Sequence, residues 1–312
     1  MNQVYCLLKI FIYTFHMIKE LKVQSAIHYH DSKFASNWDL NIYRGCEHKC
    51  KYCFAQYSHK YLNEGNSEFF GDIFVKTNVA EVLDKELSKK SWKPTNILNI
   101  CGVTDCYQPI EEKYQLMREV LKVLIKHKQS VFILTKSPLI LRDIDLIKEL
   151  NEVAYVNIAF TITTLDEKIR QKIEPNVKPS IERLLALKEF SKINCKTIVM
   201  LMPIIPYLTD NTKNLENIFK TAKECGCNFL LSAPLNMRGF VKTNFYNFLR
   251  EDFPETYQKI QKLYKGAYSC GEYNEKLSKF LYQMRIKYKL LGSGGLDNDF
   301  ETYIKNNKND LF

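Results

Sequence analysis

Short, almost wholly apolar runs alternate with longer amphipathic segments along most of the chain. Runs rich in β-branched and aliphatic residues predict strands at residues 40–44, 96–101, 130–135, 155–163, 196–204 and 228–234. The segments between them repeat their apolar residues at helical spacing, which predicts helices at 80–89, 112–126, 143–150, 180–190 and 212–224. Candidate caps support these helices, namely Asp143, Ser180 and Thr212 at N-termini and Gly226 at a C-terminus.

Strands and helices that alternate in series predict an α/β fold with a parallel sheet, because right-handed crossovers join parallel strands. The strands are nearly continuous in apolar residues, so both faces of the sheet should be covered. An open doubly wound sheet and a curved, partial barrel both satisfy the pattern, and both place a ligand site at the C-terminal ends of the strands. The pattern of residues 240–280 indicates aromatic-rich helices, which we expect to form a cap over the core.

The expected domain organisation is a lead-in at 1–37, a core at 38–238 and a C-terminal helical cap and tail at 239–312. The run from Val4 to Ile18 resembles a signal peptide, yet it contains Lys9 and His16, and no small-residue cleavage site follows it. It is also too short and too polar to span a bilayer. Met17 looks like a more natural start, so the hypothesis is that residues 1–16 are an upstream extension outside the fold.

Composition narrows the class of protein further. With 46% hydrophobic residues and only 11 glycines and 9 prolines in 312 residues, the chain has material for a packed core and no mark of disorder. The net charge of +10 favours an anionic partner such as nucleic acid, although lysines scattered along solvated helices explain it equally well. Seven of the ten cysteines are scattered, which is not a disulfide scaffold, and we expect a cytoplasmic protein in a reducing environment.

The other three cysteines, Cys46, Cys50 and Cys53, fall within eight residues. The spacing Cys-x3-Cys-x2-Cys brings three soft thiolates to one loop, which indicates a metal site. A structural zinc ion would need a fourth ligand, for which the candidates are His48, His59, Cys101 and Cys106. A four-iron cluster held by three cysteines would instead leave one iron open to a small molecule.

This loop resembles the signature of the radical S-adenosylmethionine (SAM) superfamily, which has an aromatic residue, here Tyr52, just before the third cysteine. The phrases "NIYRGCEHKCKYCFA", "GVTDCYQPIE", "ILTKSPLILRDIDLI", "FTITTLDEKIRQKIEP" and "PIIPYLTD" resemble the branch related to spore photoproduct lyase, often labelled DNA repair photolyase. The likeness runs in order from about Trp38 to Pro234. It implies a partial (β/α)6 TIM-type barrel with parallel strands and a helical C-terminal cap.

The resemblance also implies the cofactors and the reaction. A [4Fe-4S] cluster on Cys46, Cys50 and Cys53 would bind SAM at its open iron, and an external donor of the flavodoxin or ferredoxin type would supply an electron. Cleavage of SAM would give methionine and a 5'-deoxyadenosyl radical that abstracts hydrogen from a substrate. The protein orients these cofactors and excludes water. The substrate is not identified by the sequence, and damaged DNA is one candidate.

Residues at successive strand ends match places where relatives contact SAM, so the resemblance implies roles for them. The expected SAM contacts are Tyr52 with adenine, Gly102, Thr104 and Asp105 with the amino group or ribose, Lys136 with the carboxylate, and Thr161 with the ribose or carboxylate. Each has an ordinary explanation as well: loop packing, a glycine turn with an Asx cap, a surface lysine, or a polar strand end. Cys101 and Cys106 are the candidate hydrogen donors, although neither falls on the position that the related lyase uses.

Two other functions remain open at this point. One is a nucleic-acid-binding protein with a structural metal, which the charge and the cysteine spacing would support. The other is an enzyme of the same superfamily that modifies a peptide or a small metabolite. Because the substrate-binding cap varies within a fold family, the sequence does not choose among substrates.

Overall fold

The computed structural model describes residues 17–31, 36–61, 68–93 and 96–290. The predicted lead-in at 1–37 is therefore described only at 17–31 and 36–37, and the hypothesis about residues 1–16 and the end of the predicted tail lie outside the described residues. Among the described residues, no helix combines the length and the apolar character needed to cross a lipid bilayer.

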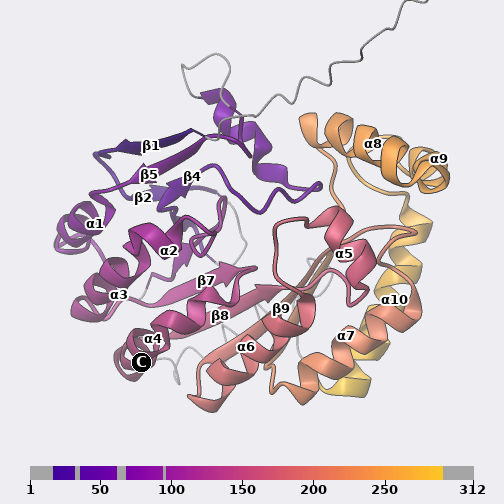
Figure 1. The fold of residues 1–312 in the computed structure, drawn as a ribbon. Helices are drawn as coiled ribbons and strands as arrows, with labels where there is room; N and C mark the ends of the chain where they lie inside the picture. Colours follow the sequence, from indigo (N-terminus) through magenta and orange to yellow (C-terminus); the bar gives the residue numbers. More distant parts are fainter. Residues whose placement is uncertain (1–16, 32–35, 62–67, 94–95, 291–312) are drawn as a thin grey trace, which may run out of the picture.

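A seven-stranded sheet forms the centre of the molecule (Figure 1), with the strands in the order β10-β9-β8-β7-β6-β3-β2. Six strands are parallel: β3 (Trp38–Leu40), β6 (Leu98–Ile100), β7 (Val131–Thr135), β8 (Val156–Thr161), β9 (Lys196–Ile204) and β10 (Phe229–Pro234). The seventh, β2 (Ile27–Tyr29), pairs antiparallel with β3 at one edge. Since β2 and β10 are the two edges, the described strands form an open sheet, and the predicted partial barrel of six parallel strands is confirmed.

Helices alternate with these strands along the chain and pack against their neighbours. They are α1 (Val79–Leu87), α3 (Leu116–Lys126), α4 (Ile144–Val153), α6 (Ser180–Lys192) and α7 (Thr212–Glu224). Helix α1 contacts α3, α3 contacts α4, and α6 contacts both β8 and β9. Buried apolar residues from one face of the strands and from the helices form one large core cluster. The other face of the central strands carries a second cluster, so these strands are apolar on both faces; its residues are Phe132, Ala159, Ile198, Met200, Phe229 and Leu231.

Two predicted elements are divided in the structure. The strand predicted at 40–44 is split between β3 and β4 (Tyr43–Arg44), which belongs to a separate small sheet with β1 (Ile18–Leu21) and β5 (Ile73–Lys76). The helix predicted at 112–126 is interrupted at Gln115, whose φ of +50° lies in the left-handed region and separates α2 (Glu111–Tyr114) from α3. Strand β5, helix α5 (Glu167–Ile173) and the 3-10 helices η1 (Phe54–Tyr61) and η2 (Pro138–Asp143) were not predicted.

Of the three predicted N-caps, Asp143 stands at an N-cap position, and Thr212 and Ser180 do not. Helix α7 is capped by Asn211, whose side chain accepts a hydrogen bond from the Asn214 N–H, rather than by Thr212. Asp143 does stand at the N-cap position of α4, but its carboxylate makes no cap bond and pairs with Arg118. Ser180 is already inside α6, which follows Pro179. The predicted helix stop at Gly226 is confirmed by its φ of +77° directly after α7.

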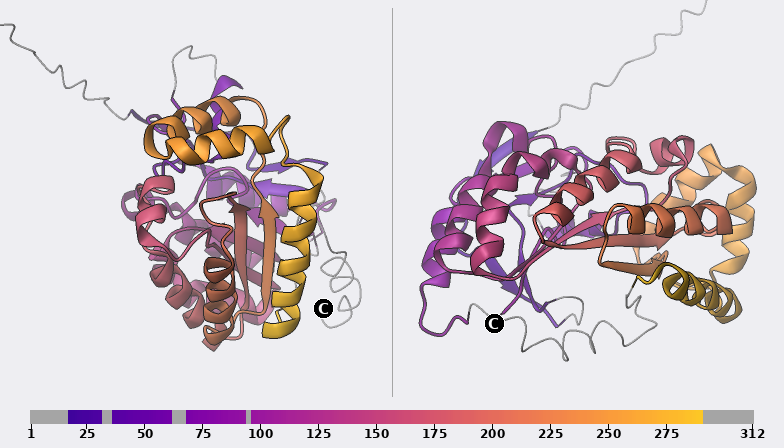
Figure 2. Two further views of the ribbon diagram at one scale, coloured as in Figure 1. Left: turned by 90° about the vertical axis from the view of Figure 1, so that its right-hand side faces the viewer. Right: turned by 90° about the horizontal axis from the view of Figure 1, so that it is seen from below.

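The C-terminal cap is helical, as predicted, and consists of α8 (Phe240–Asp252), α9 (Pro254–Leu263) and α10 (Gly271–Tyr288). Helix α10 packs against α7, whereas α8 and α9 lie beyond the C-terminal ends of the strands (Figure 2). Phe245, Leu249 and Ile260 of the cap share one apolar cluster with Cys50 and Tyr52. The cap therefore packs directly on the three-cysteine loop.

Candidate functional site

A cavity of about 880 Å³ opens at the C-terminal ends of the parallel strands. This volume lies within the range of about 300–1,000 Å³ that is typical of ligand-binding pockets. The predicted site residues that line it are Cys46, Cys50, Tyr52, Cys53, Cys101, Gly102, Thr104, Asp105, Lys136 and Thr161. Of the predicted site residues, Cys106 alone is not part of the lining.

The three-cysteine loop follows β4 and is fixed by backbone bonds to distant segments. The Cys46 N–H donates to the Phe69 carbonyl at 3.1 Å, and the Lys51 N–H donates to the Ile173 carbonyl at 2.9 Å. Gly45, with a φ of +84°, allows the loop to pass the backbone of Asp72, whose carbonyl oxygen would lie 2.2 Å from an added Cβ. A residue with a side chain would push the loop away from its place in the cavity wall.

The three thiols are free, and the spacing of their sulfur atoms separates two kinds of metal site. Among the described residues, the only set of three or more Cys, His, Asp or Glu ligand atoms that all lie within 4.8 Å of one another is Cys101, Asp105 and Cys106. A zinc ion with Zn–S bonds of about 2.3 Å would bring its sulfur ligands to within about 3.8 Å of each other. Cys46, Cys50 and Cys53 are spread more widely, as expected when each thiolate binds a different iron of a cluster.

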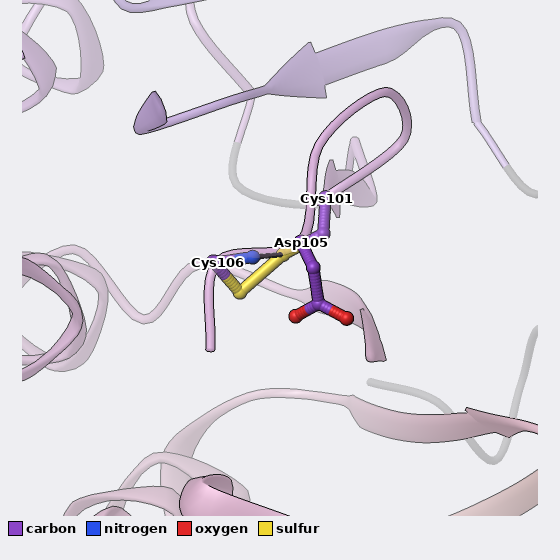
Figure 3. Close-up of side chains that lie close together, drawn as sticks. All are labelled: Cys101, Asp105 and Cys106. Carbon is purple, nitrogen blue, oxygen red and sulfur yellow. Dashed lines mark hydrogen bonds between the residues drawn. A yellow bond between two sulfur atoms is a disulfide. The ribbon is translucent and has the colours of Figure 1, made fainter. Parts of the chain in front are cut away.

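The suggested fourth zinc ligands are engaged elsewhere. His48 Nε2 lies 3.1 Å from the Asp105 carboxylate, and both side chains are almost fully buried. The His59 ring packs edge-on against Phe69. Cys101 and Cys106 are bonded to each other (Figure 3). The structure therefore offers no support for a closed site of four ligands on the three-cysteine loop.

Burial controls the protonation of the thiols and of the lysine beside them. Burial raises the pKa of Cys46, Cys50 and Cys53 to about 12, so each is a neutral thiol at pH 7 in the metal-free protein, and metal binding must release protons. Burial lowers the pKa of Lys136, but the nearby Cys50 and Glu174 outweigh this and raise it overall. Lys136 is therefore an ammonium ion in the cavity wall, with Nζ 6.0 Å from the centre of the Tyr52 ring.

Asp105 connects the ends of β6 and β7. Its carboxylate accepts hydrogen bonds from the Thr135 hydroxyl and from the Lys136 N–H, each at 2.7 Å. Burial raises the pKa of Asp105, but the charge and hydrogen bond of His48, together with these donors, lower it to about 2. The carboxylate thus fixes the position of Lys136, and its predicted contact with SAM stays a prediction.

The neighbouring turn is equally constrained. The Val103 and Thr104 N–H groups both donate to Asn41 Oδ1, at 2.9 and 3.2 Å, and the Thr104 hydroxyl donates to the Tyr43 carbonyl at 2.9 Å. A Cβ on Gly102 would lie 2.8 Å from Asp39 Oδ2. A side chain at position 102 would therefore displace the Asp39 carboxylate from its hydrogen bond with Asn99, whether or not the glycine also contacts a cosubstrate.

Sequence reasoning missed the buried ion pair behind Tyr52. The Tyr52 hydroxyl donates to Glu174, and Arg183 Nη2 lies 2.8 Å from the other oxygen of that carboxylate. The side chains of Glu174 and Arg183 are 0% exposed, and Arg183 also donates to the Thr161 carbonyl at 2.6 Å. Burial raises the pKa of Glu174, but Arg183 and Lys136 lower it overall, so the carboxylate is ionised. This network orients the Tyr52 ring and joins the cysteine loop to β8.

The mouth of the cavity carries aromatic side chains that are open to solvent. Phe54 and Tyr57 on η1 are 55% and 43% exposed, and both line the cavity. Arg238, at the base of the cap, also lines it and donates to the hydroxyl of the exposed Tyr268, with its guanidinium 5.2 Å from that ring. Planar faces and a cation therefore surround the entrance.

Comparisons with known proteins agree with this geometry. A family profile described as the radical SAM superfamily matches residues 40–219. An uncharacterized protein of Mycobacterium bovis is 31% identical over 257 residues, covering 82% of this chain and 75% of that protein. An uncharacterized protein of Methanocaldococcus jannaschii is 31% identical over 222 residues, covering 71% of this chain and 78% of that protein.

Solved structures share the fold at low sequence identity. Spore photoproduct lyase complexed with dinucleoside spore photoproduct has a TM-score of 0.68 at 12% identity, covering 90% of this chain and 82% of that one. SuiB of Streptococcus suis bound to S-adenosylmethionine has a TM-score of 0.52 at 14% identity, covering 86% of this chain and 48% of that one.

Proposed function

The chain belongs to the radical SAM superfamily, and we propose that it holds a [4Fe-4S] cluster on Cys46, Cys50 and Cys53 and uses it to cleave SAM reductively. The observation that carries this proposal is the placement of three free thiols in the wall of one large cavity at the ends of the parallel strands. Cys46, Cys50 and Cys53 would hold the cluster, which would supply the electron for SAM cleavage and so the 5'-deoxyadenosyl radical that would abstract hydrogen from a substrate.

The chain's own residues bind and orient SAM. The backbone N–H of Lys136 is held by Asp105, and its ammonium group would pair with the SAM carboxylate. The Tyr52 ring, fixed through Glu174, presents a planar face inside the cavity for the adenine. Gly102, Thr104, Asp105 and Thr161 line the wall beside these groups and are the remaining proposed SAM contacts.

For the substrate, we favour damaged nucleic acid. The exposed Phe54 and Tyr57, with Arg238 beside Tyr268, give the mouth of the cavity the stacking faces and the cation that an unstacked base needs. The net charge of +10 favours a polyanion, and the solved structure of spore photoproduct lyase contains a dinucleoside. We further propose that an external donor of the flavodoxin or ferredoxin type supplies the electron in the cytoplasm.

Anaerobic reconstitution with iron and sulfide tests the cofactor assignment. We expect a broad iron–sulfur absorbance and SAM-dependent release of 5'-deoxyadenosine, and Cys46→Ala, Cys50→Ala and Cys53→Ala should each lose both. Cys195→Ala changes a buried thiol elsewhere in the core and should keep both signals. Stoichiometric zinc without SAM cleavage, or full cluster content in any of the three loop variants, would contradict the proposal.

Fluorescence anisotropy with ultraviolet-damaged and intact single-stranded oligonucleotides tests the substrate class. Because a base–aromatic stack contributes about 1–3 kcal/mol, Phe54→Ala should weaken binding by about 5- to 150-fold. Tyr282→Ala, which removes an equally exposed aromatic from α10, is the matched control and should bind as the parent does. Equal binding by the two variants would argue against nucleic acid at this mouth and leave peptides or small metabolites to be tested.

A further inference from the structure

The Cys101–Cys106 pair closes the turn that follows β6, at the edge of the cavity. The two sulfur atoms form a disulfide across a sequence separation of 5, and the Cys106 N–H donates to Cys101 Sγ at 3.0 Å (Figure 3). The two residues differ in their surroundings. Cys101 is 6% exposed and lines the cavity, whereas Cys106 is 1% exposed and is not part of the lining. A reagent in the cavity therefore meets the sulfur of Cys101 first.

The turn does not depend on the disulfide for its shape. Val103 and Thr104 are held by the Asn41 side chain, and Asp105 is held by His48 and Thr135. When the sulfur bond is broken, these contacts keep the two thiols side by side, and the short loop between them makes closure easy. The same turn can therefore hold either redox state.

We infer that Cys101 and Cys106 are a reversible dithiol–disulfide couple in which Cys101 is the sulfur attacked from the cavity and Cys106 is the resolving sulfur. A small external thiol, as its thiolate, attacks Cys101 Sγ and breaks the disulfide, and Cys106 leaves as a thiolate that takes a proton. A second external thiol then attacks the sulfur that the first one contributed and releases Cys101 as a thiol. Two electrons pass to the protein, and the two external thiols leave as their own disulfide.

The couple decides whether the cavity contains a hydrogen donor. In the dithiol state Cys101 presents an S–H group, and in the disulfide state it has no hydrogen to give. This consequence rests on the proposed function, because a thiol donor matters only where a substrate radical forms. The thiol exchange itself does not, since it needs neither the cluster nor SAM.

Mass spectrometry tests the exchange, because trypsin leaves both cysteines in the single peptide 91–113. Cluster-loaded protein is equilibrated without oxygen in mixtures of 2-mercaptoethanol and its disulfide, quenched with acid, and alkylated after denaturation. We expect two forms of peptide 91–113 that interconvert reversibly. The dithiol form carries two alkyl groups. The disulfide form carries none and is lighter than the unalkylated dithiol by two hydrogens. Exposed Cys270, in peptide 266–276, reports in each sample whether the mixture reacts with an accessible thiol.

Two variants test the assigned roles. In Cys106→Ser, the peptide should accumulate a mixed disulfide of mercaptoethanol at Cys101, because no resolving thiol is present. In Cys101→Ser, buried Cys106 should stay unmodified. Two alkyl groups on the parent peptide in every mixture, or a mixed disulfide at Cys106 as abundant as at Cys101, would overturn the inference. Since SAM is absent throughout, loss of SAM cleavage in a separate assay would count against the proposed function alone.

Discussion

The buried pair of Glu174 and Arg183 gives a quantitative test of how the cysteine loop is held. The pair is 2.8 Å apart with both side chains 0% exposed, and Arg183→Met removes the guanidinium that pairs directly with the buried Glu174 carboxylate. Removal of one partner from a buried ion pair costs about 3–5 kcal/mol, most of it from the stranded charge. The variant also loses the bond to the Thr161 carbonyl, so we expect a loss in the free energy of unfolding of about that size.

Urea unfolding of the metal-free protein, followed by circular dichroism, measures this loss as a lower midpoint at unchanged slope. Lys192→Met is the control, because its pair with Glu189 is 2.7 Å long but 59% and 43% exposed, and such pairs contribute about 0–1 kcal/mol. Adding Glu174→Gln to Arg183→Met should restore part of the stability, since the stranded charge is removed. If Arg183→Met falls within about 1 kcal/mol of the control, the pair does not anchor Tyr52 in the way described here.

Three further predictions concern two residues in the wall of the cavity and one in strand β5 of the small sheet. Gly102→Ala should destabilise the fold by about 1–3 kcal/mol in the same urea assay, because the new Cβ would lie 2.8 Å from Asp39 Oδ2. Gly266→Ala is the control and should be near neutral, because its Cβ would meet no atom within 4 Å. Equal losses of stability in the two variants would exclude crowding as the cause. Lys136→Met should raise the dissociation constant of SAM by about 10- to 150-fold, because a hydrogen bond to a charged group is lost. Calorimetry on the cluster-loaded protein measures this constant, and Lys51→Met, the control, should leave it unchanged. Unchanged SAM affinity in Lys136→Met would reject the role assigned to Lys136. Burial lowers the pKa of Lys76 to about 8, so between pH 8 and the ordinary value of 10.5 the unfolded chain binds a proton that the folded chain lacks. The stability of the parent relative to Lys76→Met should therefore rise with pH across that window, and a constant difference in unfolding free energy would contradict it.

The fold could be predicted where local pattern and tertiary environment agree. The strand predicted at 130–135 and the helix predicted at 212–224 match Val131–Thr135 and Thr212–Glu224 almost residue for residue. The prediction failed where long-range pairing decides the structure. Strand β5 pairs with β1, which lies more than fifty residues earlier, and no pattern within the four residues of β5 predicts this pairing. The break at Gln115 depends on one left-handed residue, which is also invisible to periodicity.

Some residues of the candidate site could be predicted from local sequence, and others could not. The three thiols, Tyr52 and Lys136 could be found because a motif or a strand end marks them in the sequence. Arg183 could not be found in this way, because a single arginine in a helix is expected to be exposed to solvent. Only the fold brings it beside Glu174. Cys101 and Cys106 were noticed as separate thiols, but their bond depends on a turn geometry that the spacing alone does not fix.

The contact between the cap and the three-cysteine loop constrains when the cofactor can be built in. Cys50 shares its apolar cluster with Phe245 and Ile260, which leave the ribosome long after it does. In a nascent chain, the three-cysteine loop is therefore exposed to water until the cap helices α8 and α9 have been synthesised. If the chain holds the proposed cluster, iron and sulfide would then be delivered to the completed polypeptide, by a step that follows translation.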